Sequence, residues 1–323
     1  MACATKALAA ALMVLCFGVA AQAQEPSSED IVVTSQRVRE MAETFAATVA
    51  VAPVSENQYA RWNSRLCPSV SGLAGEDAQT LIDHIALRAN AVGLVVEPSG
   101  CQPNLVLVFA PDSDAITRQI VDSRRDLLGY YSDDDLVTAG REALEAFANT
   151  PRAVRWWHVA NTVTADGRVL RNSGSRTGRG TLDAVRGSQG MGAEAATTGN
   201  GFGGMEAVRS NGTRARRATR QDLGFVLVVV DTRRIAGVPT SAVADYLAMA
   251  SLVHLDPEAD MSAYPSILNL FAPRPSGVAP PLAMSAWDQA YLEGLYAMTR
   301  EAANSRQQRS QIARRMAEAV AQE

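Results

Sequence analysis

Residues 225–230 form an uninterrupted apolar run, and an alanine-rich segment, residues 243–255, follows it closely. A short apolar run bounded by polar residues is typical of a strand that is covered on both faces of its sheet. The alanine-rich segment predicts a helix, for which Thr240 is a suitable N-cap. A buried strand that leads into such a helix favours a fold of the α+β class, with a mixed, mainly parallel sheet and helices packed against it.

Periodicity in the first half of the chain predicts the elements around this strand. Residues 77–92 place their apolar side chains on one helical face, and Gly93 is well placed to end the helix. Residues 104–109 are apolar on both faces, which predicts a central strand, whereas residues 155–164 alternate, which predicts an edge strand. Further patterns predict helices at 38–50, 115–128 and 133–147 and a short strand at 94–96.

The C-terminal part is predicted to be mostly helical. Ser285 and Asp288 have the spacing of a capping box and start one helix. The residues from 305 onward, rich in Arg and Gln, predict a last one. We therefore expect a single domain at residues 38–304, followed by a C-terminal helix at 305–323.

The N-terminus has the pattern of a secretory signal peptide, residues 1–23. Lys6 precedes an apolar run at residues 7–20, and Ala21-Gln22-Ala23 offers a small-x-small cleavage site. We expect cleavage near Ala23, a flexible segment at 24–37, and a periplasmic or secreted protein. No later run is apolar and long enough to predict a transmembrane segment in the mature chain.

The composition is that of a globular protein, apart from one segment. Of the 323 residues, 47% are hydrophobic and 20% are charged, and the formal net charge of −4 argues against a nucleic-acid partner. Residues 171–222 are different, because they are rich in glycine and carry nine arginines against four acidic residues. Such a segment buries little apolar surface, so we expect a long, disordered insertion between two strands.

Two cysteines remain after the signal peptide, Cys67 and Cys101. An even number in an exported chain predicts a disulfide bond. The alternative is a pair of buried free thiols. A metal site is disfavoured, because neither cysteine has a CxxC partner or a nearby histidine.

One cluster of positive charge lies at the end of the insertion. Its arginines could hold anionic lipid headgroups, an envelope polymer or an acidic protein face. The alternative is a solvated loop that keeps the chain soluble. The residues concerned are Arg214, Arg216, Arg217 and Arg220.

The last third of the chain resembles the catalytic half of the zincin-type metallopeptidases, most of all the metzincins. After the alanine-rich helix comes Tyr264-Pro265-Ser266-Ile267-Leu268-Asn269, and the next helix ends in Leu292-Glu293-Gly294-Leu295-Tyr296. In metzincins a helix with the motif HExxH is followed by a Ser-Ile-Met turn and by a helix of comparable pattern. The resemblance implies a zincin-like fold over residues 76–110 and 223–298.

The zinc ligands of that family are missing. The resemblance aligns its two histidine positions with Tyr246 and Ala250, its glutamate with Leu247, and its third ligand with Asp256. Zincin chemistry needs two histidines one helical turn apart and a glutamate that polarises the metal-bound water. We therefore expect no catalytic residues, no metal and no cofactor, and treat these positions as a degenerate site. The chain's three histidines, His84, His158 and His254, are interpreted as surface or hydrogen-bonded side chains.

These observations favour an exported, non-catalytic zincin-like protein with a binding or accessory role. The cleft of such a fold lies beside an edge strand, which can accept an extended peptide by strand addition, and residues 155–164 are the expected edge. Two alternatives remain at this point. One is a metal-dependent peptidase with atypical ligands, and the other is an envelope-binding module that acts through the arginine-rich loop.

Overall fold

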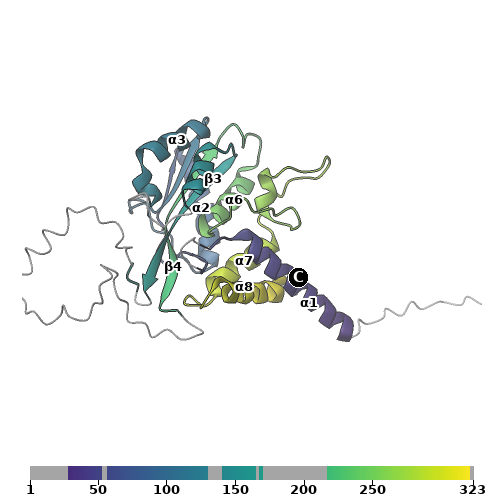
Figure 1. Cartoon of the computed structure of the whole chain (residues 1–323). Coiled ribbons are helices and arrows are strands. Elements are labelled where there is room, and N and C mark those ends of the chain that lie inside the picture. The colour runs from purple at the N-terminus through teal and green to yellow at the C-terminus, as the bar shows by residue number, and fades with distance from the viewer. Residues whose placement is uncertain (1–27, 53–56, 130–139, 165–166, 170–216, 321–323) are drawn as a thin grey trace, which may run out of the picture.

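A computed structural model describes residues 28–52, 57–129, 140–164, 167–169 and 217–320 (Figure 1). It contains one mixed sheet of four strands in the order β1-β2-β4-β3. β1, β2 and β4 are parallel, and β3 pairs antiparallel with β4 at the edge. The expected α+β class and mainly parallel sheet are therefore confirmed. The strands are β1 (Pro68–Ser71), β2 (Leu105–Ala110), β3 (Val154–Thr164) and β4 (Thr219–Asp231).

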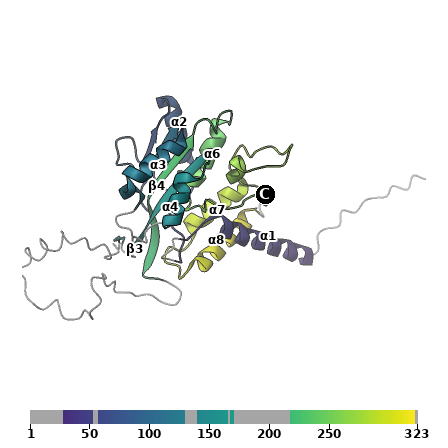
Figure 2. The same cartoon turned by 45° about the horizontal axis from the view of Figure 1, so that its top comes forward.

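Helices cover both faces of this sheet (Figures 1 and 2). On one face, Val226, Val228 and Val230 pack into the main core together with α2 and α6. On the other face, Leu227 and Val229 pack with α3 and α4 in a smaller core. Successive side chains of the run at 225–230 therefore enter cores on opposite faces of the sheet, which explains why the run has no polar residue. The helices are α1 (Ser28–Val49), α2 (Gly75–Ala91), α3 (Ser113–Ser123), α4 (Arg141–Asn149), α6 (Thr240–Leu252), α7 (Ala286–Ala297) and α8 (Ser305–Val320), with 3-10 turns η1 (Arg125–Leu128) and η2 (Ile267–Phe271).

The helices α7, α8 and α1 pack together at one end of the molecule (Figure 1). Gly294 allows α7 to approach α8 closely, since a Cβ atom there would lie 3.1 Å from the Cα of Ile312. The predicted capping box is present: Ser285 Oγ accepts from the amide of Asp288, and the Asp288 carboxylate accepts from the amide of Ser285. The final helix begins at the predicted residue, Ser305.

Several predicted boundaries are wrong. α1 begins at Ser28, whereas the predicted first helix begins at residue 38. The buried face at Ala42, Phe45 and Val49 fixes the later turns, and a helix that has formed extends at small cost per residue. The predicted strand at 94–96 is reduced to one bridge, in which Val96 pairs with Leu66.

The insertion is shorter than predicted at its C-terminal side, because β4 already begins at Thr219. Residues 171–216 of it lie outside the described residues, as do the predicted signal peptide and the start of the helix predicted at 133–147. Within the described ranges, no helix is both long and apolar enough to cross a membrane.

The predicted disulfide bond joins Cys67 to Cys101, with their Cα atoms 6.0 Å apart and a sequence separation of 34 residues. It ties the start of β1 to the loop that precedes β2. Next to it, the side chain of Asn104 accepts from the amide of Cys67 at 2.7 Å and donates to the carbonyl of Arg65 at 2.9 Å. The bond therefore fastens the β1 end of the sheet.

Replacing both cysteines with serine should lower the free energy of unfolding by about 3–4 kcal/mol, because a loop of this length is no longer closed in the unfolded chain. Urea unfolding of the double variant against the oxidised protein measures the difference. Equal stability of the two proteins, with the bond shown intact in the latter, would contradict this prediction.

Candidate binding groove

The site is organised by α6, which is buried along almost its whole length. The last carbonyl groups of a helix have no partner within the helix, and burying them unpaired is costly. Here three side chains from other elements bind them. The bonds run from His158 Nε2 to Ala250 at 2.8 Å, from Trp62 Nε1 to Ser251 at 2.7 Å, and from Tyr296 Oη to Leu252 at 2.8 Å.

A carboxylate fixes the other half of α6. Asp245 accepts from Arg88 at 2.8 and 3.0 Å, from His84 at 2.8 Å and from the amide of Met284 at 2.7 Å. Burial by itself would raise the pKa of Asp245. The hydrogen bonds outweigh burial and hold this pKa below its usual value. α6 is thus attached to α2 on one side and to the segment before α7 on the other.

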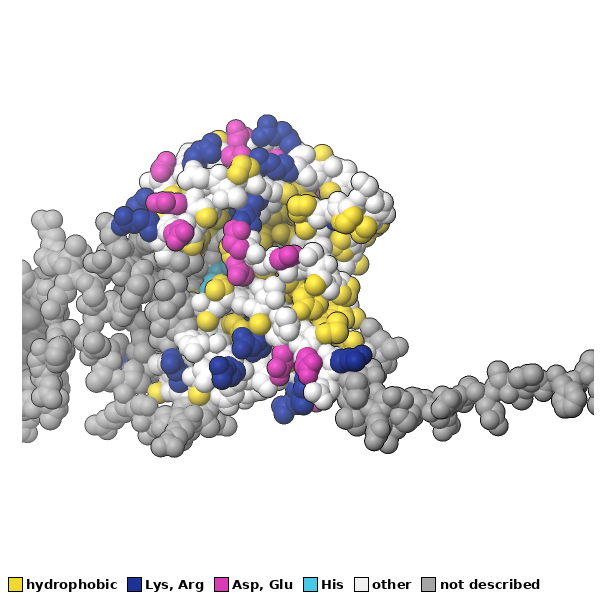
Figure 3. Space-filling model, turned by 45° about the vertical axis from the view of Figure 1, so that its right-hand side comes forward, with side chains coloured by type: hydrophobic (Ala, Val, Ile, Leu, Met, Phe, Trp, Pro, Cys, Tyr) yellow, Lys and Arg dark blue, Asp and Glu magenta, His cyan; other side chains and the backbone are white. Residues whose placement is uncertain are grey.

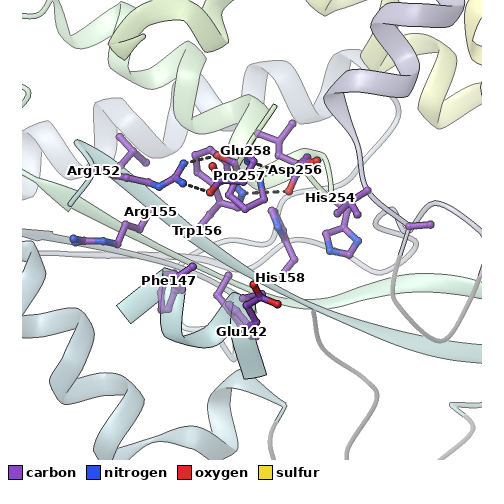
Figure 4. A pocket seen from close by; sticks show the side chains of 17 residues that line it. Glu142, Phe147, Arg152, Arg155, Trp156, His158, His254, Asp256, Pro257 and Glu258 are labelled. Carbon is purple, nitrogen blue, oxygen red and sulfur yellow. Dashed lines mark hydrogen bonds and ion pairs between the residues drawn. The ribbon is translucent and has the colours of Figure 1, made fainter. Parts of the chain in front are cut away.

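Beyond α6 the chain runs beside β3 and encloses a cavity of about 490 Å³, which we call the β3 groove (Figure 4). One wall comes from α4 and the other from residues 254–258 together with Val51 and Ala52. Residues 154–158 of β3 lie between the walls. At one end Arg152 binds the carbonyl of Pro257 and the carboxylate of Glu258, which connects the edge of the sheet to the second wall.

The outer backbone edge of β3 faces this groove. The amide of Asp231 donates to the carbonyl of Ala153 at 2.9 Å, which sets the hydrogen-bonding register between β4 and β3. Since bonded pairs alternate along an antiparallel ladder, the backbone groups of Trp156 and His158 point away from β4. No backbone partner for them is found within the described residues. Within the described part of the chain, the edge of β3 along the groove is therefore unpaired at Trp156, which is half-buried, and at His158, which is buried.

Two buried histidines meet beside the groove. The ring centroids of His158 and His254 lie 5.1 Å apart with an edge-on orientation. Burial lowers the pKa of His158 to about 4, although its bond to the Ala250 carbonyl opposes the shift. Burial and the neighbouring His158 lower the pKa of His254 to about 3. Both rings are neutral at pH 7, and Nε2 of His158 carries the proton, because a carbonyl can only accept.

The four positions that the alignment assigned to a degenerate zinc centre are not brought together at the groove. Leu247 and Ala250 are fully buried inside α6. The ring of Tyr246 packs against Trp156 and Phe271, and burial raises its pKa. Only Asp256 lines the groove, and its carboxylate accepts from the amide of Glu258 at 2.9 Å.

The turn that follows α6 is held by one buried carboxylate. Asp288 accepts from Ser266 Oγ at 2.6 Å and from the amide of Ile267 at 2.8 Å, in addition to its capping contacts with Ser285. Burial raises the pKa of Asp288 in spite of these bonds. The segment containing Ser266, Ile267 and Leu268 is therefore fastened to the start of α7.

The arginine cluster is only partly described. Arg214 and Arg216 lie outside the described residues. The amide of Arg217 donates to the carbonyl of Glu301 at 2.8 Å. Arg220 is largely buried and binds the carboxylate of Asp222 at 3.0 Å, so its charge is already paired within the sheet.

The described part of the chain holds no group of three or more His, Cys, Asp or Glu side chains arranged for a metal ion. Comparisons with protein-family models, with curated proteins and with solved structures return no match for this chain.

Lowering the pH should destabilise the fold through the two buried histidines. In the folded protein, His158 stays neutral down to about pH 4 and His254 down to about pH 3. In the unfolded chain, both gain a proton near pH 6.5. The unfolded state then binds more protons, so the free energy of unfolding falls between about pH 6.5 and pH 4. Urea unfolding across this interval measures the fall.

The double variant His158→Gln, His254→Gln provides the control. Glutamine at position 158 keeps an N–H donor for the Ala250 carbonyl but does not titrate. We expect a flatter dependence of stability on pH. A fall as steep as that of the parent protein would show that other groups cause it.

Proposed function

We propose that this protein is an exported, non-catalytic member of the zincin-like fold class that binds an extended peptide as an added strand along β3. The observation that carries the proposal is the β3 groove, in which unpaired backbone of an edge strand lies between two walls of side chains. An extended peptide bound to such an edge gains main-chain hydrogen bonds, and pockets select its alternate side chains.

The order of elements supports the zincin-like class. A buried strand, β4, leads into the buried helix α6, and η2 and α7 follow. The Ser-Ile-Leu sequence of the resemblance lies at the start of η2, with Ser266 as its N-cap, and Asp288 of the following helix binds it. The cleft that the resemblance implies lies beside an edge strand, and the groove occupies such a position next to β3.

The chemistry of the site favours binding over catalysis. Leucine at position 247 cannot transfer a proton, and alanine at position 250 has no donor atom for a metal. Nε2 of His158 is already used by the Ala250 carbonyl. Export is supported by the signal-peptide pattern of the first 23 residues and by the disulfide bond between Cys67 and Cys101, which persists in oxidising compartments.

The groove sets the form of the ligand. Its edge runs over residues 154–158, so a matching strand has about five residues at roughly 3.3 Å each. Ala143 and Ala146 of α4 and Trp156 of β3 line it with apolar surface, whereas Glu142 adds a carboxylate. We expect peptides with small or apolar residues at alternate positions and a basic residue beside Glu142.

Selection from a library of short peptides, followed by binding measurements, tests this function. In the selected peptide, N-methylation removes one backbone donor at a time. Strand addition predicts a loss of about tenfold or more at every second residue, and little change at the residues between. Equal losses at all residues, or no selected peptide at all, would count against the proposal.

A matched pair of substitutions on α4 locates the binding site. Ala146→Phe fills the groove without removing a core side chain and should weaken peptide binding by about tenfold or more. Glu145→Phe places the same ring on the exposed face of α4, outside the groove, and should leave the affinity within about twofold. Equal effects of the two substitutions would place the peptide elsewhere.

The contact between His158 and His254 is the one observation that favours a metal-dependent peptidase with atypical ligands. The binding proposal predicts substoichiometric zinc in the purified protein and no cleavage of a denatured protein substrate when zinc, cobalt or manganese is supplied. About one equivalent of zinc, lost in His254→Leu, would favour the peptidase instead.

A further inference from the structure

We propose a second site, independent of the β3 groove, at which a phosphate-bearing anion with two or more negative charges binds between α1 and α8. An open hollow of about 560 Å³ lies there, which we call the α1–α8 hollow. Three arginines line it, Arg39 from α1 and Arg306 and Arg314 from α8, and its lining contains no carboxylate. At this end of the molecule, Figure 3 shows several Arg side chains with Asp and Glu side chains between them.

The amide side chains in the lining strengthen the inference, because their oxygen atoms are already used. Gln307 accepts from the amide of Ala303 at 2.9 Å, and Gln311 accepts from the amide of Thr299 at 2.8 Å. Asn304 accepts from the amide of Gln307 at 2.9 Å. A backbone N–H can only donate, so each partner must be the side-chain oxygen, and each NH₂ group remains as a donor.

The hollow is therefore rich in donors. No ion pair of Arg39, Arg306 or Arg314, and no hydrogen bond from the three amide nitrogens, occurs within the described part of the chain. Glu40, the acidic residue next to Arg39, accepts from Gln36 and is not in the lining. Guanidinium groups bind phosphate oxygens in bidentate geometry, and neutral amide donors complete such a site.

Calorimetric titration of the full chain with inorganic pyrophosphate at low salt tests the site. Gln311→Glu keeps an oxygen for the amide of Thr299 but replaces the NH₂ donor with a negative charge. We expect binding weaker by about tenfold or more. Arg39→Ala combined with Arg314→Ala, both at exposed positions, should abolish detectable binding without affecting the fold.

Arg315→Ala is the matched control, because Arg315 is an exposed arginine of α8 outside the lining. It should change the affinity by less than about twofold at constant salt. Thermal unfolding verifies that all variants remain folded. An equal loss in Arg315→Ala, or an unaltered affinity in the Arg39, Arg314 double variant, would overturn the site, as would the absence of pyrophosphate binding by the parent protein.

Vesicles that contain phosphatidylglycerol distinguish the two sources of such a group. Vesicle binding with the same order of effects among the variants supports the site and identifies a lipid headgroup as its ligand. Binding of pyrophosphate without binding of vesicles supports the site and identifies a soluble phosphate. Vesicle binding that all variants retain equally would show general attraction of positive charge and would count against the site.

Discussion

The C-terminal end of α6 is the constraint on which the rest of the structure depends. A helix that is buried along its length must find partners for its last carbonyl groups inside the protein. His158, Trp62 and Tyr296 supply them from β3, from the segment before β1 and from α7. Three distant parts of the chain thus meet at one helix end, and the loss of any one donor would leave a buried carbonyl unpaired.

This arrangement also places the groove. Because α6 ends against β3, the chain that leaves it runs beside the outer edge of that strand. The amide of Val51 donates to the carbonyl of His254 at 3.1 Å, and the amide of Asp256 donates to the carbonyl of Val49 at 3.0 Å. These bonds pair the backbone of residues 254–258, which form one wall of the groove, with the end of α1 rather than with β3. The strand edge therefore stays unpaired. The fold holds the groove open through its own core contacts.

The same contacts explain the chemistry of the groove. His158 must remain neutral to donate to the Ala250 carbonyl without a buried charge, and its ring packs on His254, which is also neutral. The two histidines beside the strand edge are therefore uncharged, whereas charged side chains, among them Arg155 of β3 and Glu142 and Asp256 of the walls, also line the groove. An extended peptide, with neutral backbone and variable side chains, matches this distribution of charge.

The local elements were largely predictable from the sequence. The run at 225–230, the helix after it and the edge strand follow from hydrophobic periodicity, and the pairing of Cys67 with Cys101 follows from their number and the predicted compartment. The contact between His158 and His254 was not predictable, because 96 residues separate them and only the tertiary fold brings them together.

The candidate site was less predictable than the fold. Alignment to a known motif pointed to Tyr246, Leu247 and Ala250, but a buried helix turns these side chains into the core. The residues that line the groove come from the loop after α6, from α4 and from β3. The donors of the α1–α8 hollow could not be predicted from the sequence either. Whether the NH₂ group of a side-chain amide is free depends on which partner its oxygen has in the folded protein.

Residue-resolved amide hydrogen exchange along β3 tests the central claim most directly. If the outer edge of the strand is unpaired, the outward amides of Trp156 and His158 exchange faster than the inward amides of Arg155 and Trp157, and a bound peptide slows only the outward ones. Uniform slow exchange of all four amides in the free protein would contradict the account, because the edge would then already be occupied.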